Sequence, residues 1–133
     1  MTFRTSSIIQ TIIALYASDM SKLANFYIEA IDLKIKERGD DFICLGRGEI
    51  EVNIIKMNGK PGMPVEKDEG FSIREETPIK CSFLIDSFDQ VRKAIKAYGG
   101  GLKDDNEAWD WRGVRHLDGF DPEGNVVQFR VKI

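Results

Sequence analysis

The 133-residue sequence has few cysteines and no block of basic residues. A secreted chain of this size usually carries more cysteines than its two, Cys44 and Cys81. Each lies in an apolar, strand-like run, so we expect buried free thiols and no disulfide. Lysine and arginine are scattered along the chain, with no block long enough to follow a phosphate backbone, and this argues against nucleic acid as a partner.

Long apolar segments are also absent from the sequence. The longest stretch, residues 8–17, is interrupted by Gln10 and Thr11 and is too short to cross a bilayer. The N-terminus lacks the basic region and apolar core of a signal peptide. We therefore expect no membrane partner and a cytoplasmic location.

The chain does contain enough apolar material for one core. It is 42% hydrophobic and 31% charged, with a net charge of -3. Its length is short for two ordinary domains. The composition thus predicts a single globular domain over residues 1–133.

The most informative segment is DPEGNVVQF, residues 121–129, which predicts a turn followed by a strand. Proline presets φ, glycine tolerates positive φ, and Asp121 can bond its own backbone. In the strand, Val127, Phe129, Val131 and Ile133 form one face, and Val126, Gln128 and Arg130 form the other. The second face is polar for a strand so close to the end of the chain, and it is where we expect function.

A tandem repeat predicts the fold class. A strand ending at Ala17 precedes a helix over residues 20–30, and a strand over 80–85 precedes a helix over 88–98. Short strands follow each helix, at residues 33–38, 42–45 and 50–55 in the first half and at 102–104, 114–120 and 126–132 in the second. We predict an α+β fold of two tandem βαβββ modules, residues 8–56 and 78–133, joined by a linker over 57–77.

Two irregular segments leave alternatives open. The linker is either a plain connection or a lid that brings Phe71 or Arg74 to a site. The segment 106–113 carries both tryptophans, Trp109 and Trp111, which either cap the core or line a ligand pocket.

Strand alternation separates a helix-covered side from an open side in each module. We expect the open sides to form a cavity with convergent polar groups, unless they are simply solvated. The residues placed on the open sides are Ile12, Ala14, Tyr16, Glu49, Glu51 and Asn53 in the first module and Lys80, Ser82, Leu84, Val126, Gln128 and Arg130 in the second.

The pattern Ile13-x-Leu15-x-Ala17-x-Asp19-Met20, with Phe26-Tyr27 following, the tandem plan and the closing DPEGNVVQF together resemble the vicinal oxygen chelate superfamily. This superfamily includes glyoxalases, extradiol dioxygenases, fosfomycin-resistance enzymes and bleomycin-resistance proteins. The resemblance implies that sheets curve around a cavity, that small members form homodimers, and that metal-dependent members hold ligands on the first and last strands of each module.

Carried over residue by residue, the superfamily's ligand positions fall on Ile12, Glu51, Lys80 and Gln128. Ile12 has no donor atom, and a protonated Lys80 repels a divalent cation. The single histidine, His116, lies outside the pattern, and we interpret it as a hydrogen-bonded structural residue. The sequence therefore argues against a metal cofactor, and Lys80 and Glu51 could instead form an ion pair between modules.

Three functions follow from these residues. The first is a metal-free protein that binds or sequesters a small organic molecule, resembling bleomycin-resistance proteins. The second is a glyoxalase-like lyase or isomerase that uses Glu51 as a base and Lys80 as a nucleophile or oxyanion partner, or an atypical metal site. The third is a non-catalytic interaction module. The predicted ligand-binding residues are Tyr16, Glu51, Asn53, Lys80, Ser82, Trp109, Trp111, Gln128 and Arg130.

Overall fold

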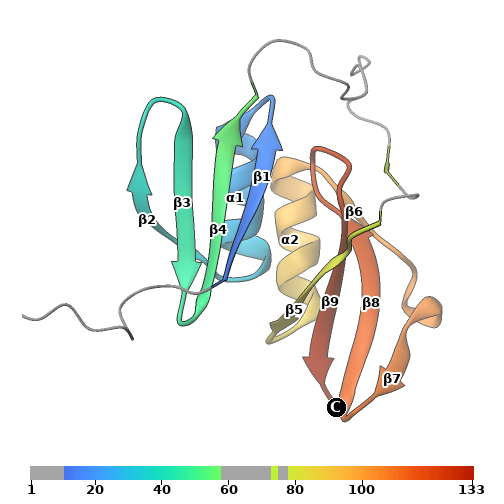
Figure 1. Ribbon diagram of the computed structural model, residues 1–133. Coiled ribbons are helices and arrows are strands. Elements are labelled where there is room, and N and C mark those ends of the chain that lie inside the picture. Colours follow the sequence, from blue (N-terminus) through green and yellow to red (C-terminus); the bar gives the residue numbers. More distant parts are fainter. Residues whose placement is uncertain (1–10, 58–72, 75–77) are drawn as a thin grey trace, which may run out of the picture.

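The computed structural model describes residues 11–57, 73–74 and 78–133. The fold is α+β, with two modules that share one strand plan (Figure 1). The first module contains β1 (Ile12–Ala17), α1 (Met20–Ala30), β2 (Lys34–Arg38), β3 (Phe42–Arg47) and β4 (Ile50–Lys56). The second contains β5 (Cys81–Ile85), α2 (Phe88–Tyr98), β6 (Gly101–Leu102), a 3₁₀ turn (Asp105–Glu107), β7 (Trp109–Trp111), β8 (Val114–Phe120) and β9 (Val126–Lys132).

Both sheets are mixed and have the same topology. Their strand orders are β1-β4-β3-β2 and β5-β9-β8-β6, with β7 paired to β8. In each module the first strand lies parallel to the last, and the remaining pairs are antiparallel. The predicted repeat of βαβββ modules is therefore present, and β7 is an addition to the second.

The two helices have the bounds that the sequence predicts. α1 begins after Asp19, whose carboxylate accepts a hydrogen bond from the Lys22 N–H at 3.0 Å. α2 begins after Ser87, whose N–H donates to the Gln90 side chain at 3.3 Å, and it ends at Gly99 with φ 98°. Neither helix, at eleven residues each, is long enough to cross a membrane.

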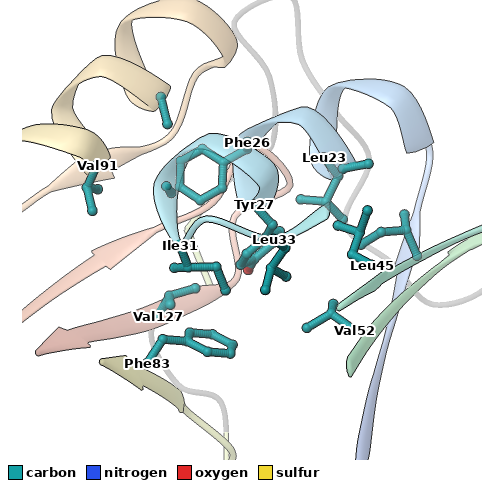
Figure 2. Packing of buried hydrophobic residues seen from close by; sticks show 14 of the residues in the cluster. Leu23, Phe26, Tyr27, Ile31, Leu33, Leu45, Val52, Phe83, Val91 and Val127 are labelled. Atoms are coloured by element: carbon teal, nitrogen blue, oxygen red, sulfur yellow. The ribbon is translucent and has the colours of Figure 1, made fainter. Parts of the chain in front are cut away.

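The core lies between the helices and the sheets and includes residues of both modules. Figure 2 shows α1 between them, with Leu45 and Val52 of the first sheet on one side and Phe83 and Val127 of the second on the other. Val91 of α2 belongs to the same cluster and is fully buried. Burial of this surface is the main favourable term that holds the modules together.

The turn over residues 121–125 joins the modules through buried polar contacts. The Asp121 carboxylate accepts a hydrogen bond from the Tyr27 hydroxyl of α1 at 2.6 Å. It also accepts from the backbone N–H groups of Glu123 and Asn125 at 2.9 and 3.0 Å. Burial raises the pKa of Asp121, although these hydrogen bonds act in the opposite direction. Burial likewise raises the pKa of Tyr27 well above its ordinary value, and Asp121 adds to the effect.

Glu123 makes a second contact between modules. Its side chain, in a residue that is 2% exposed, accepts from the N–H groups of Ser18 and Asp19 at 3.1 and 3.0 Å. These N–H groups are at the start of α1, so a carboxylate of the second module lies at the positive end of the first module's helix. Arg74 lies against the same turn, since its N–H donates to the Gly124 carbonyl at 2.9 Å.

Several predicted details differ from the structure. The segment 106–113 is not wholly irregular, because Arg112 and Gly113 take φ of 54° and 78° and connect β7 to β8 as a tight hairpin. β6 begins and ends earlier than predicted and has only two residues. Cys44 and Cys81 are free, as expected, but they are half-buried: Cys44 is the register partner of Asn53 on the open side of the first sheet, and Cys81 packs against the edge of the core. Phe71 and most of the predicted linker lie outside the described residues.

Candidate functional site

The strands of the second sheet lie side by side (Figure 1), and their register places polar and aromatic residues in rows on the side that no helix covers. In one row, Ser82, Gln128 and Asp118 are register partners on β5, β9 and β8. In the next row, Leu84, Arg130, His116 and Trp109 are partners on β5, β9, β8 and β7. We call this surface the polar face; its members are Lys80, Ser82, Trp109, His116, Asp118, Gln128 and Arg130.

A chain of hydrogen bonds crosses the polar face. The Arg130 Nε donates to the Ser82 hydroxyl at 2.7 Å, and this hydroxyl donates to the Gln128 Oε1 at 2.6 Å. The Gln128 amide then reaches Asp118 Oδ1 at 3.5 Å, and Lys80 Nζ donates to Asp118 Oδ2 at 2.8 Å. Each polar side chain is thereby held by its neighbours, with a cation at both ends of the chain.

Aromatic rings lie beside this chain. The Trp109 and His116 rings stack with centroids 5.2 Å apart and planes 14° apart, and Trp111 lies 6.1 Å from the same imidazole. Lys80 Nζ is 5.8 Å from the Trp109 ring centroid. His116 is 5% exposed, and its Nδ1 has no hydrogen-bond partner in the described part of the chain. His116 therefore belongs to the polar face, and this nitrogen lacks the structural hydrogen bond that we expected.

A cavity of about 410 Å³ opens beside the Lys80–Asp118 pair. Its apolar walls include Leu102, Phe120 and Val126. A larger cavity, about 590 Å³, lies near the start of α2, where Arg92 pairs with Asp89 and Asp105, and Arg115 pairs with Asp110. The smaller cavity is therefore the better candidate for ligand recognition, because it adjoins the polar chain.

The open side of the first sheet has a different character. Glu51 forms an ion pair with Lys36 at 3.2 Å, and the Asn53 Oδ1 is buried without a hydrogen-bond partner in the described residues. Burial, reinforced by a hydrogen bond with Glu51, raises the pKa of the Cys44 thiol to about 11. Tyr16 is 58% exposed. These residues do not join the polar face, so the predicted site residues divide between two surfaces.

The predicted ion pair between Lys80 and Glu51 is wrong within the chain. Each residue already has a partner in its own module, Asp118 for Lys80 and Lys36 for Glu51. Gly46 explains the second pairing, because a Cβ at this position would lie 2.6 Å from the Lys36 side chain. Because Gly46 has no side chain, the Lys36 side chain can extend over β3 from β2 and reach Glu51 on β4.

Asp118 is the site residue that the sequence reasoning missed. The alternation of β8 carries the signal: if Gln128 is on the open side, its hairpin partner must be there too, and that partner is Asp118. The same reasoning places His116 beside Arg130.

The side chains present do not fit the superfamily's metal centre. Ile12, at the first ligand position, is the register partner of Glu51 and offers no donor atom. At two further positions, Lys80 donates a hydrogen bond to Asp118, and Gln128 accepts one from the Ser82 hydroxyl. Across the described residues, no group of three or more histidine, cysteine, aspartate or glutamate side chains could hold an ion. The donor set thus disagrees with the fold's usual metal chemistry.

Comparison with solved structures supports the fold. A glyoxylase/bleomycin resistance protein/dioxygenase domain from Frankia sp. EAN1pec aligns with TM-score 0.64 and 16% identity over 92% of this chain and 96% of its own. The fosfomycin resistance protein FosX from Listeria monocytogenes, in complex with Mn(II) and sulfate, aligns with TM-score 0.62 and 18% identity over 92% and 89%. The hypothetical protein SA1046 from S. aureus gives 0.59 and 20% over 92% and 96%.

These similarities show that the chain has the fold of glyoxalase/bleomycin resistance/dioxygenase and FosX proteins, which is the fold that the sequence resemblance predicts. No family model and no curated protein matches the sequence. Identities of this size carry the fold and not the activity. Function must therefore be argued from the polar face.

Proposed function

We propose that the protein binds a small organic molecule on the polar face without a metal ion. The observation that carries this proposal is the hydrogen-bonded chain from Arg130 through Ser82, Gln128 and Asp118 to Lys80, on the side of the sheet that no helix covers. Polar groups already held in place lose little conformational entropy on binding, which favours recognition.

The surroundings suit a molecule of mixed polarity. The cavity of about 410 Å³ has apolar walls on one side and the Lys80–Asp118 pair on the other. Trp109, 43% exposed, extends the apolar surface along the next row. We therefore infer binding or sequestration of the kind that bleomycin-resistance proteins carry out, with no bond chemistry required.

A lyase or isomerase is the second candidate, and one observation favours it. Lys80 and Asp118 form an acid and base pair at 2.8 Å beside the cavity. If the protein catalyses a proton transfer, the geometry favours Asp118, and not Glu51, as the partner of Lys80. The interaction module is the third candidate, supported by exposed apolar side chains on the open sides, such as Ile12, Tyr16 and Leu84.

The same exposed side chains support a homodimer, in which a second copy would cover the open sides. The dimer and the cytoplasmic location stay predictions. Sedimentation or light scattering at several protein concentrations would measure the first. A monomer at every concentration would contradict it.

The test of the binding proposal is a fragment screen by ligand-observed NMR, on protein with and without chelator treatment. We expect the same compounds to bind in both samples. Replacing Gln128 with alanine should weaken them about tenfold, because one charge-linked hydrogen bond and its neighbours are lost. Glu51→Ala, on the other sheet, is the matched control and should leave affinity unchanged. Binding that appears only with stoichiometric metal would contradict the proposal.

A further inference from the structure

We propose that the row formed by Trp109, His116 and Arg130 binds the carboxylate and ring of a flat aromatic acid. This inference rests on the proposed function and names the class of ligand. The row is fixed by the strand register, since His116 is the partner of both Trp109 on β7 and Arg130 on β9. Strands lie about 4.8 Å apart, so one or two fused rings with a carboxylate span the row.

Arg130 is an oriented cation that no described acid neutralises. Its Nε donates to the Ser82 hydroxyl at 2.7 Å, and its Nη2 reaches the Ser82 carbonyl at 3.4 Å. None of the ion pairs formed by the described residues includes it. A guanidinium has five N–H donors in a fixed plane, so donors remain for a carboxylate.

Trp109 supplies the surface for a ring. One face of its indole covers the imidazole of His116, with 14° between the planes. The residue is still 43% exposed, with Lys80 Nζ 5.8 Å from its ring centroid, although tryptophan is highly buried on average. The exposed indole surface can stack a second planar group in the offset geometry that aromatic pairs prefer.

The local charge selects an anion. Lys80 is compensated by Asp118, but Arg130 is not compensated, and the Arg112 guanidinium lies 4.4 Å from the Trp111 ring centroid. The aromatic end of the polar face is therefore cationic in a protein whose net charge is -3. The guanidinium groups of Arg130 and Arg112 would repel an organic cation and attract an organic anion.

His116 adds an independent observation. It is 5% exposed, and its Nδ1 is buried without a hydrogen-bond partner among the described residues. An unpaired buried polar atom is costly, and such atoms in folded proteins usually find partners. In the tautomer that protonates Nδ1, an oxygen of the ligand would complete the hydrogen bond. In the other tautomer Nδ1 accepts, so the unpaired nitrogen favours a ligand with a polar atom there, and the Arg130 cation selects an anionic acceptor.

The test is isothermal titration of the full chain with naphthoate, its neutral analogue naphthamide, and the non-aromatic acid cyclohexanecarboxylate. We expect naphthoate to bind at least about tenfold more tightly than either analogue, because each lacks one of the two interactions. Arg130→Gln should remove this preference for the acid over the amide. Trp109→Leu should remove the preference for the aromatic acid over the saturated one.

Lys132→Gln is the matched control, because it removes an exposed cation two residues along the same strand. It should leave naphthoate affinity unchanged; an equal loss there would show general charge attraction and overturn the inference. Arg130→Lys keeps the charge and should retain part of the binding, which separates recognition from misfolding, and thermal melting would check the fold of each variant. Naphthamide binding as tightly as naphthoate would also overturn it.

Failure of this inference is distinct from failure of the proposed function. If naphthoate does not bind, but fragments bind and lose affinity in Gln128→Ala, the polar face is a ligand site and the aromatic acid is wrong. If neither naphthoate nor any fragment binds, both proposals are wrong.

Discussion

The second module contains two polar regions, the turn over residues 121–125 and the polar face. They differ in how deeply their polar groups are buried and in how many of these groups have hydrogen-bond or ion-pair partners. In the turn, Asp121 and Glu123 are at most 2% exposed, and both carboxylates accept several hydrogen bonds. On the polar face, Arg130 has no acidic partner, and His116 Nδ1 has no partner among described residues. Polar groups that are fully hydrogen-bonded in the interior stabilise the fold, whereas polar groups with unused hydrogen-bonding capacity on an uncovered surface can bind a ligand.

The largest expected effect comes from Asp121→Ala. The substitution leaves the Tyr27 hydroxyl and two backbone N–H groups without their acceptor in the interior. We expect a loss of about 4 kcal/mol in the free energy of unfolding, measured by urea denaturation. The matched change on the polar face, Asp118→Ala, should cost about 1 kcal/mol or less, because its ion pair is partly exposed. Equal losses would remove the distinction between the two regions.

Glu123→Gln should have the next largest effect. The amide keeps the size of the side chain but removes the negative charge that lies at the start of α1, where the N–H groups of Ser18 and Asp19 donate to it. We expect a loss of about 1 to 2 kcal/mol, measured in the same way. Glu107→Gln, on an exposed 3₁₀ turn, is the control and should change little. High salt should not abolish the Glu123 effect, since the carboxylate is buried.

The pH dependence of stability should report the buried Asp121. Burial raises its pKa in the folded protein, so the folded state holds this proton more tightly than the unfolded state, whose aspartates titrate near about 3.9. The resulting stabilisation is present below that value and is lost as the pH rises through the folded pKa. The advantage of the wild type over Asp121→Asn should therefore shrink as the pH rises from about 3 to 7, measured by thermal melting. A growing advantage would mean that the hydrogen bonds outweigh burial.

The smallest effects belong to the two half-exposed ion pairs, Lys80–Asp118 and Lys36–Glu51. Double-mutant cycles on Lys80→Met with Asp118→Asn, and on Lys36→Met with Glu51→Gln, should each give a coupling of about 0.5 kcal/mol. Ligand affinity should change only in the Lys80 cycle. A coupling of several kcal/mol for Lys80 and Asp118 would indicate a structural role, and the polar face would then resemble the turn.

The turn illustrates what local sequence can predict. Its conformation is predictable from the sequence, because Pro122, Gly124 and the hydrogen bond from the Glu123 N–H to the Asp121 side chain act over a few residues. Gly124 has a positive φ of 88°, as the turn requires. Its partners were not readable. Tyr27 and Ser18 lie 94 and 105 positions away from the acids that bind them, so only the packing of α1 against the second module brings them together.

The polar face shows the same division. Alternation placed Ser82, Gln128 and Arg130 on one open side, because side chains of a strand point to opposite sides in turn. The ion pair between Lys80 and Asp118 is not predictable from alternation alone, because it also depends on the hairpin register of β8 with β9. The ion pair between Lys36 and Glu51 is not predictable in this way either, because it depends on the missing side chain of Gly46 on the strand between them.

Local features of the sequence are enough to predict the two modules, the bounds of both helices, the closing turn and the lack of a donor atom at Ile12. These depend on residue type, periodicity and local capping, which act within a few residues. The folded chain is needed to see which charges pair, that the closing turn joins the two modules, and that β7 places Trp109 in the same row as His116 and Arg130. Those outcomes depend on strand register and packing between distant segments, which no local pattern encodes.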